Sequence, residues 1–398
     1  MKKILLLVML LLIAGSLTAG DRYYASPFRW YSPEVQAQGG SFVANAEGFN
    51  ALLSNPAAFA KSEDKDNKKG GTGKKGEITV LSISSSYSGN IFEFMEEYRS
   101  RPDDIIGIVL DQVTSHGIGA GFQIGSGYVG RGFGFGFMSV MDTNLPVAET
   151  TLGVTMDLSW TNGLVAGYAH PFNLNHVKLV VGADVRPMYR ILIPGVDISS
   201  FTDTVSEDDE EDSGDDVDFS NIDAMAGIGV AVDAGADVYW QDLIFSLTMR
   251  DIGNTRFFFN PLNSLGGVTF SDNDDIDDSY ITPWSLNFAV AYHPVFGKLN
   301  KYIDLTVHGA YSQPLIFEDN IYGYDSQSFW TKLDLGAEVI LLSSVALRTG
   351  FQGGYFTAGF GLDLYFMELN GALYSEEVGS YAGAEPKMGG ALEFAFRF

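Results

Sequence analysis

The 398-residue chain has no cysteine, and charged residues make up only 19% of it, against about 25% in an average soluble domain. The lack of cysteine excludes a disulfide framework, a cysteine-ligated metal site and a lipid anchor on an N-terminal cysteine. Basic residues are also scarce, since 24 Lys and Arg stand against 50 Asp and Glu and give a formal charge of −26. A chain this acidic repels phosphate, so we expect no nucleic-acid partner.

Long apolar runs are missing beyond the first twenty residues, which argues against membrane-spanning helices. The N-terminus has two lysines, an apolar run over 4–13 and small residues over 14–20. This order is typical of a secretory signal peptide, so we predict one over 1–20, with cleavage near Ala19 or Gly20. An uncleaved anchor is the alternative, although the run is shorter than the ~20 residues that a span requires.

Glycine and aromatic residues are abundant, and apolar residues recur at every second position along most of the chain. In the last seven residues, for example, Leu392, Phe394, Phe396 and Phe398 share one side. Such alternation is typical of strands with one apolar face. The segments have about the length of a tilted membrane-spanning strand, and short and long links alternate between them. The sequence therefore predicts an all-β, transmembrane antiparallel barrel, and a soluble sandwich is the alternative.

The strand count follows from parity, because single-chain bacterial barrels close with an even number of strands. A periplasmic C-terminus places 188–221, 251–282, 312–329 and 376–385 outside. The sequence has fifteen candidate strands, one too many for an even number. We omit 117–125, which is glycine-rich, has no polar face and is read as a loop or lumen segment, and fourteen strands are left. The candidates are 77–88, 117–125, 128–141, 149–159, 161–170, 177–188, 222–237, 241–250, 283–293, 302–311, 330–341, 344–351, 354–364, 366–375 and 386–398.

The mature N-terminal region precedes the first strand and is rich in aromatic residues that require burial. A fourteen-strand barrel is too wide for wall side chains to fill. We therefore predict that 21–76 forms a plug in the lumen, ending in a charged linker over 61–76, and that 77–398 forms the barrel. Glycines in the strands would let the plug backbone approach the wall closely.

An Asn-Pro-Ala motif, Asn55, Pro56 and Ala57, lies between aromatic residues ahead of the first strand. In this setting the chain resembles the FadL-type outer-membrane hydrocarbon transporters, in which such a motif lies in an N-terminal hatch inside a fourteen-strand barrel. The segments 353–362 and 374–379 are similar to the related UPF0164 and PorV-like barrels. The resemblance implies that Asn55, Pro56 and Ala57 are hatch residues and that the hatch gates a hydrophobic channel with a sideways opening.

Two acidic runs lie on predicted outer loops, with ten acids in 203–218 and five in 272–278. A divalent-cation site is one interpretation, but neither run has the spacing of an EF-hand loop. Diffuse attraction of counter-ions is the interpretation that we prefer.

Charged residues on the inner faces of the predicted strands include Asp184, Arg186, Glu338, Arg348 and Arg397. We expect them to form cross-strand ion pairs and hydrogen bonds to the plug, and a charge-lined pore is the alternative. No histidine has the setting of a nucleophilic triad or of a metal ligand. We therefore predict neither an enzyme nor a metal or other cofactor.

These features predict a cell outer-membrane barrel that passively takes up hydrophobic small molecules such as long-chain fatty acids. Ligand would enter among loop residues such as Phe257, Phe258 and Phe259, and the alternative is that these pack within the loop or form an interfacial belt. The other partners that we expect are outer-membrane lipid and the periplasmic barrel-assembly machinery, which would contact the C-terminal strand ending in Phe398. The alternatives are a surface barrel that binds partner proteins, as secretion shuttles do, a plain diffusion porin and a structural or adhesive barrel without transport.

Overall fold

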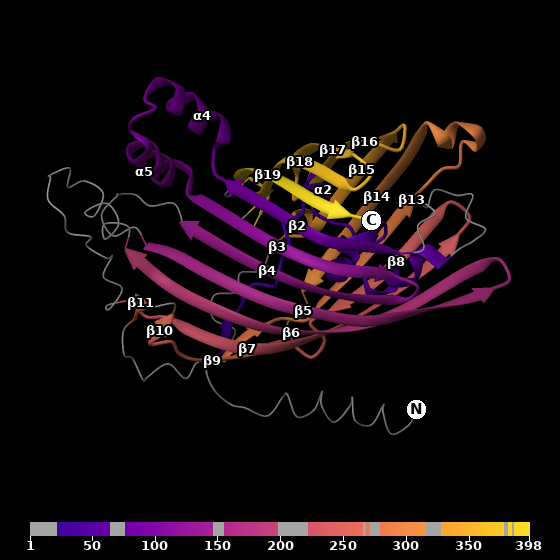
Figure 1. Cartoon of the computed structure of the whole chain (residues 1–398), viewed down its shortest axis with the longest axis horizontal. Helices are drawn as coiled ribbons and strands as arrows, with labels where there is room; N and C mark the ends of the chain where they lie inside the picture. The colour runs from indigo at the N-terminus through magenta and orange to yellow at the C-terminus, as the bar shows by residue number, and fades with distance from the viewer. Residues whose placement is uncertain are drawn as a thin grey trace, which may run out of the picture.

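The computed structural model of the chain is an antiparallel β-barrel with its long axis across Figure 1. It describes residues 22–63, 76–145, 155–197, 222–265, 268–270, 279–314, 328–377, 381–383 and 386–398. Within this part, strands β2 to β8 and β13 to β19 follow one another around the wall. Pairing of β8 with β13 joins the two runs, and pairing of β19 with β2 closes the ring. The prediction of a fourteen-strand barrel is confirmed.

The wall strands of the first run are β2 (Glu77–Ser88), β3 (Ile118–Gly130), β4 (Phe133–Leu145), β5 (Thr155–Leu174), β6 (Val177–Asp197), β7 (Met225–Trp240) and β8 (Leu243–Arg250). Those of the second run are β13 (Ser285–Tyr292), β14 (Ile303–Pro314), β15 (Leu333–Leu341), β16 (Val345–Gln352), β17 (Tyr355–Asp363), β18 (Met367–Glu377) and β19 (Pro386–Arg397). Short strands accompany them: β1 (Arg22–Tyr24), β9 (Thr255–Pro261), β10 (Ser264–Leu265), β11 (Val268–Thr269) and β12 (Ser279–Thr282). The helices are α2 (Pro33–Ala37), α3 (Ala51–Ser54), α4 (Ile91–Ser100), α5 (Ile105–His116), and the 3-10 turns η1 (Gly48–Asn50), η2 (Pro56–Glu63), η3 (Gly297–Lys301) and η4 (Trp330–Lys332).

Most tight turns lie at one end of the barrel and most longer connections at the other; the exceptions are the two-residue turn between β16 and β17 and the longer link between β13 and β14. Between β3 and β4, for instance, Arg131 and Gly132 make a two-residue turn in which both φ angles are positive, 54° and 82°. Turns of this kind match the twist of the two strands that they join. The C-terminal residue Phe398 exchanges backbone hydrogen bonds of 3.0 Å with Ile78 at the same end. The chain therefore ends at the short-turn end, as predicted for a periplasmic C-terminus.

The omission of 117–125 from the wall is wrong, because these residues belong to β3. The inner face of β3 is mostly glycine, with Gln123 as a polar exception, because the N-terminal segment lies directly against it: Phe49 meets Gly125 and Leu52 meets Gly127. The extra candidate came instead from β5, one strand of 20 residues that we had divided at Trp160. One strand was omitted and another was counted twice, so the predicted total of fourteen was still correct.

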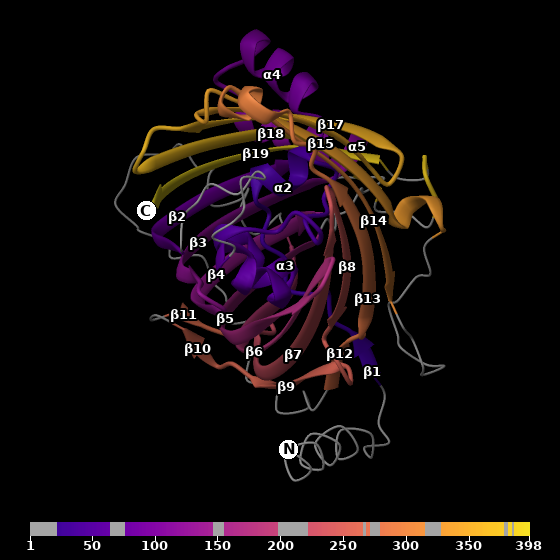
Figure 2. The same ribbon diagram turned by 90° about the vertical axis from the view of Figure 1, so that its right-hand side faces the viewer.

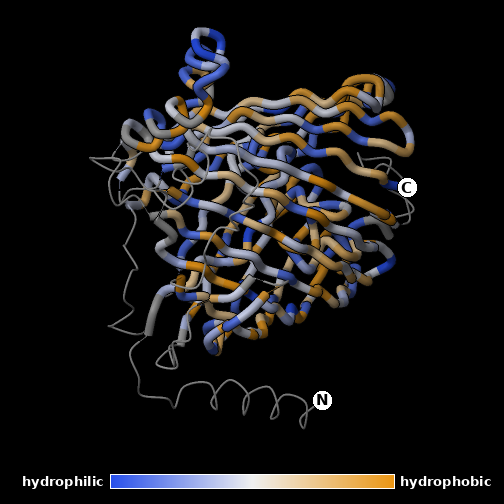
Figure 3. The backbone as a smooth tube through the Cα atoms, turned by 60° about the vertical axis from the view of Figure 1, so that its left-hand side comes forward, coloured by the Kyte–Doolittle hydropathy of each residue, from blue (hydrophilic) through white to orange (hydrophobic). Residues whose placement is uncertain are grey.

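The outer surface of the wall has many exposed apolar side chains, hereafter the lipid-facing belt. Hydrophobic and hydrophilic positions are interspersed along the strands (Figure 3). Exposed aromatic residues concentrate toward the two edges of the belt, as in barrels whose aromatic girdles meet the membrane interfaces. Near the short turns they include Phe133, Tyr168, Phe172, Trp240 and Tyr292, and toward the long loops Phe122, Trp160, Tyr189, Phe258 and Phe356. Among the helices that the structure describes, none has the length and apolar character needed to cross a membrane.

Residues 22–63, hereafter the inner segment, enter the lumen of the barrel and fill much of it (Figure 2). The helix α2 contacts β16 to β19, and the turn η2 contacts β3 to β7, so the segment touches both sides of the wall. Phe28, Phe49, Leu52 and Phe59 are buried in one apolar cluster with wall residues such as Met138. The main core of the molecule is thus the contact between the inner segment and the wall.

Candidate functional site

The Asn-Pro-Ala motif lies against two wall glycines. Gly182 of β6 and Gly235 of β7 are direct partners across the two strands. A Cβ atom at Gly182 would overlap the carbonyl group of Pro56, and one at Gly235 would overlap the side-chain oxygen of Asn55. The approach of the motif to the wall therefore requires glycine at both positions.

Asn55 is fully buried, and its amide group bonds in three directions. Its Nδ2 donates to Asp237 Oδ1 of β7 at 2.7 Å and to the carbonyl oxygen of Val43 at 3.0 Å. Its Oδ1 accepts a hydrogen bond of 3.0 Å from the Ala57 backbone N–H. Asp237 also accepts a 2.6 Å hydrogen bond from Ser246 of β8. One asparagine thus holds the turn of the motif and joins it to the wall.

Three further glycine pairs across neighbouring strands receive other parts of the inner segment. In each pair the added Cβ atoms would meet atoms of that segment at less than van der Waals distance. The pairs are Gly127–Gly136 beneath Leu52, Gly134–Gly167 beneath Phe59, and Gly336–Gly350 beneath Gln38 and Gly39. The shape of the wall is therefore complementary to the inner segment along most of its length.

A buried ionic cluster holds α2 to the opposite side of the wall. Arg348 of β16 donates to Glu338 at 2.6 Å, to Asn370 at 2.8 Å and to Glu34 of α2 at 3.1 Å. Glu34 also accepts a 2.7 Å hydrogen bond from Asn50 of the inner segment. Next to it lies a second cluster of Arg397, Glu368, Glu393 and Ser82. The predicted cross-strand ion pairs and hydrogen bonds to the N-terminal segment are present.

The wall is interrupted between β8 and β9. Residues 251–254 leave the strand, and Asp251, Gly253 and Asn254 have φ angles of 55°, 83° and 65°. Buried Arg186 of β6 stabilises this bend with hydrogen bonds to Asp233 at 2.9 Å and to Asp251 at 3.3 Å. The outer part of the wall therefore continues as a separate short strand, β9, beside β7.

The next wall strand is interrupted at the same height, between β12 and β13, where Pro283 removes a backbone donor. Beyond this break, β12 pairs with β9 on one side and with β1 of the inner segment on the other. The β1 pairing is parallel, and the Ala25 N–H extends it with a 2.9 Å bond to the Ile281 carbonyl. In the described residues β14 pairs with β13 but not with β12, so the wall neighbour of β12 is supplied by the N-terminus (Figure 2).

The three phenylalanines predicted on an entry loop lie instead on β9, so part of the 251–282 loop is wall. Phe257 and Phe259 point inward and are buried, with ring centroids 5.9 Å apart. Phe258 points outward and is 62% exposed at the level of the lipid-facing belt. Phe259 also meets Tyr280 of β12 edge to face at 5.0 Å. Aromatic rings therefore line the inner side of the interrupted wall.

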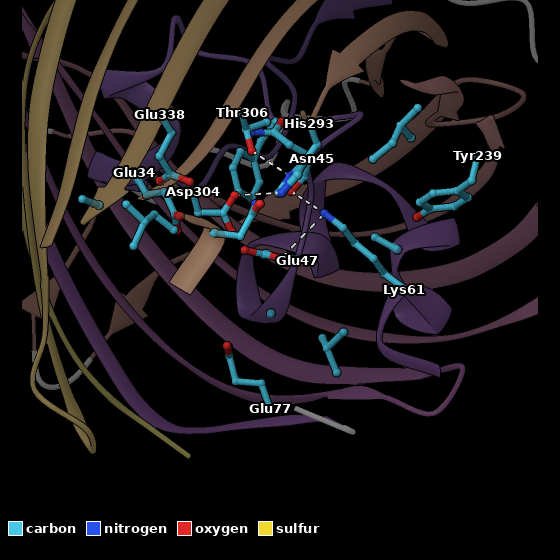
Figure 4. A pocket seen from close by; sticks show the side chains of 18 of the residues that line it. Glu34, Asn45, Glu47, Lys61, Glu77, Tyr239, His293, Asp304, Thr306 and Glu338 are labelled. Atoms are coloured by element: carbon cyan, nitrogen blue, oxygen red, sulfur yellow. Dashed lines mark hydrogen bonds and ion pairs between the residues drawn. The ribbon is translucent and has the colours of Figure 1, made fainter. Parts of the chain in front are cut away.

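A cavity of about 1020 Å³ opens beneath the inner segment at the short-turn end (Figure 4). Its lining is strongly charged, with eight carboxylates and four Lys or Arg side chains. Lys61 reaches into it and donates to the carbonyl oxygens of Asn45 and Ala46 at 3.0 and 3.1 Å. The acids are Glu34, Glu47, Glu77, Asp242, Asp304, Glu338, Asp363 and Glu368. An apolar molecule moving along the barrel axis would have to pass this charged space.

One histidine constellation on the cavity wall was not found in the sequence. Thr306 Oγ1 lies 3.1 Å from His293 Nδ1, and Asp304 Oδ1 lies 2.8 Å from His293 Nε2. The His–Asp contact has the distance of an ion pair but not the alignment of a hydrogen bond, so the three groups do not form a proton relay. The constellation connects the β13–β14 turn to β14. Only the hairpin brings the histidine to the other two residues, which no local spacing reveals.

Several predictions fall on residues that the structure does not describe. They include the signal peptide over 1–20, most of the linker over 61–76, and the acidic runs over 203–218 and 272–278. Within the described residues, no group of three or more acidic or histidine side chains has the geometry to hold a metal ion.

The closed barrel, its lipid-facing belt and its two aromatic edges define an integral protein of the cell outer membrane, with a lumen occupied by its own N-terminus. No family model matches the sequence, and no curated protein matches it.

Among solved structures, the chain is similar to the Pseudomonas putida toluene transporter TodX, with 11% identity, 95% of this chain and 99% of that chain covered, and a TM-score of 0.47. A Pseudomonas aeruginosa FadL homologue has 9% identity, the same coverage and a TM-score of 0.41. An outer-membrane enzyme, phospholipase A from Escherichia coli, matches at 10% identity over 80% of this chain and 92% of that chain, with a TM-score of 0.26.

Proposed function

We propose that this protein is a passive, non-enzymatic transporter for hydrophobic small molecules in the outer membrane. The inner segment acts as its hatch, and the exit lies in the wall rather than along the axis. The observation that carries the proposal is the pairing of β1 with β12, because here a piece of the hatch completes the wall at membrane height.

The axial route suits an apolar ligand poorly. The inner segment packs tightly on the glycine pairs of the wall, and the charged cavity follows beneath it. An apolar molecule gains nothing from that cavity, and breaking its buried ion pairs costs several kcal/mol, on the order of 3–5 per pair.

The sideways route suits such a ligand better. Behind β1 lie Phe28, Phe257 and Phe259, all buried and apolar. On the outer side of the same strands, Phe258 and its partner Ile228 face lipid. If β1 leaves β12, a passage lined by these aromatic rings joins the lumen to the bilayer. Buried Arg190 lies beside it, 4.5 Å over the Phe257 ring, and its 3.0 Å hydrogen bond to the Ser26 carbonyl must break when β1 moves.

The substrate class follows from this lining. The aromatic side chains of the passage favour hydrocarbon chains or small aromatic molecules. TodX is described as a monoaromatic hydrocarbon channel and toluene transporter. Long-chain fatty acids are the other class that we propose, since a carboxylate can remain at the outer rim while the chain enters.

The test is binding and uptake of a fluorescent long-chain fatty acid by the refolded barrel in lipid vesicles, with unlabelled fatty acid and toluene as competitors. Asn55→Ala with Pro56→Ala is the hatch variant, and Asn173→Ala, at the exposed end of β5, is its control. We expect saturable, displaceable binding and a changed uptake rate in the hatch variant only. A folded barrel that neither binds nor transports either class contradicts the proposal and favours a barrel that binds partner proteins.

A further inference from the structure

The first outer connection forms a helical hairpin, α4 and α5, that lies outside the ring of strands (Figure 2). Val109 and Val113 of α5 pack on Tyr87, Ile118 and Leu145. In each of their strands these wall residues alternate with lumen-facing ones, so their side chains point away from the lumen. The hairpin therefore covers the outer surface of the barrel rather than its mouth.

This contact continues directly into the lipid-facing belt. Phe122 of β3, Met141 of β4 and Trp160 of β5 form one exposed apolar row across three paired strands. The pair Ile118 and Leu145, covered by α5, lies four residues further along the same face. Four residues of strand span roughly 13 Å, or about 9 Å along the membrane normal at a tilt of about 45°, slightly more than the roughly 5–8 Å of one headgroup region. The hairpin thus lies where the outer edge of the membrane meets the wall.

The free side of α4 is an apolar stripe. Phe92, Met95 and Tyr98 follow at intervals of three residues and are 60%, 48% and 46% exposed. This spacing places them on one face of the helix. Arg99 projects from the same arc and makes no ion pair with any residue that the structure describes. An exposed apolar stripe is typical of helices that lie in a membrane interface, although Glu93, Glu96 and Glu97 outnumber Arg99 in α4.

The orientation of α4 is stabilised from several directions. Its N-cap Asn90 accepts a hydrogen bond from the Glu93 N–H at 3.3 Å. The ring of Phe94 lies 5.8 Å from that of Tyr87 on the wall. At the other end, Arg101 pairs with Asp104 of the hairpin turn at 3.3 Å and with Asp111 of α5. The stripe therefore has a defined direction relative to the barrel.

We infer that the α4–α5 hairpin is a membrane-surface element, with the stripe of Phe92, Met95 and Tyr98 inserted into the outer leaflet beside the barrel. The continuity of its packing surface with the lipid belt identifies lipid as the occupant. Arg99 reaches the anionic headgroups from the edge of the stripe, as long basic side chains do at interfaces. The inference does not depend on transport.

The lack of native cysteine makes a clean test possible. Nitroxide labels are placed on Met95→Cys in the stripe and, as a control, on Ser100→Cys, which is also exposed but lies on the polar side of the same helix. The protein is reconstituted in vesicles of phosphatidylethanolamine and phosphatidylglycerol. We expect the label at 95 to be relaxed more by oxygen than by a water-soluble nickel chelate, and the label at 100 to show the opposite preference.

Equal, water-like accessibility at both positions would overturn the inference. A second variant keeps the result interpretable if labelling disturbs the helix: Phe92→Ser with Met95→Ser and Tyr98→Ser should leave the barrel folded, as judged by its heat-modifiable migration. In vesicles of the same composition, a fluorophore attached to Glu96→Cys in this background, excited apart from the native tryptophans, should lose at least half of its quenching by nitroxide-labelled lipid. Unchanged quenching would also contradict membrane insertion. A stripe that is water-accessible in vesicles but protected in intact cells would indicate a protein partner instead.

Discussion

The side chain of Asn55 donates a 2.7 Å hydrogen bond to Asp237, and neither residue is exposed to solvent. This bond joins the inner segment to β7 two residues from Gly235, the glycine on which the Asn-Pro-Ala motif rests. Hydrogen bonding and close packing thus act at one point of the wall. Both can be removed separately by mutation.

Asn55→Ala should release the inner segment from this point. The variant leaves the Asp237 carboxylate and the Val43 carbonyl with fewer partners in a buried site, which costs about 1–3 kcal/mol. Urea unfolding in detergent and the rate of protease cleavage within 22–63 measure the effect, with Asn173→Ala as control. Cleavage no faster than in the parent protein would show that the asparagine does not hold the segment.

Gly182→Ala should have a larger effect on the lumen than on the wall. The added methyl group overlaps the Pro56 carbonyl, so the inner segment must move, at a cost of about 1–3 kcal/mol. We expect a higher single-channel conductance in planar bilayers. The matched control is Gly163→Ala, where the nearest atom would lie at an ordinary 3.6 Å. Equal conductance in the two variants would refute close packing at Gly182.

Arg348→Met should destabilise the barrel strongly. It leaves Glu34 and Glu338 buried without their cation, and removing one partner of a buried ion pair costs about 3–5 kcal/mol. Thermal unfolding followed by gel mobility measures this change. Arg101→Met on the outer hairpin is the comparison, because its ion pairs are exposed and contribute little. A similar unfolding temperature for both variants would contradict a structural role for the Arg348 cluster.

Phe259→Ala and Phe258→Ala separate the two faces of β9. Phe259 lies in the buried apolar cluster, whereas its neighbour faces lipid. We expect slower uptake of hydrophobic ligand with Phe259→Ala, together with a stability loss of about 3–5 kcal/mol. Uptake should be unchanged with Phe258→Ala. Rates are compared at a temperature at which gel mobility shows both variants folded. A defect confined to Phe258→Ala would contradict the proposal that ligand passes the inner face of β9.

Period-two alternation was sufficient to predict the barrel, because each wall strand has one lipid-facing side. It failed at β3, where close contact with Phe49 and Leu52 requires glycine on the inner face, so no polar pattern marks the strand. It failed again at β9, which pairs with β7 only after the excursion over 251–254. The sequence predicted that wall glycines would let the inner segment approach closely. It did not predict which glycines pair across strands, because cross-strand register depends on the whole closed wall.

The most direct test is a disulfide between β1 and β12. Tyr23 and Tyr280 are register partners, so Tyr23→Cys with Tyr280→Cys can lock the N-terminal strand in the wall. Leu373→Cys with Gly390→Cys, partners across the antiparallel strands β18 and β19, is a control lock between wall strands away from the passage. We predict that oxidation of the first pair stops uptake of the fluorescent fatty acid, that reduction restores it, and that the second pair has no effect. Full uptake through the oxidised first pair would contradict a side exit at β1.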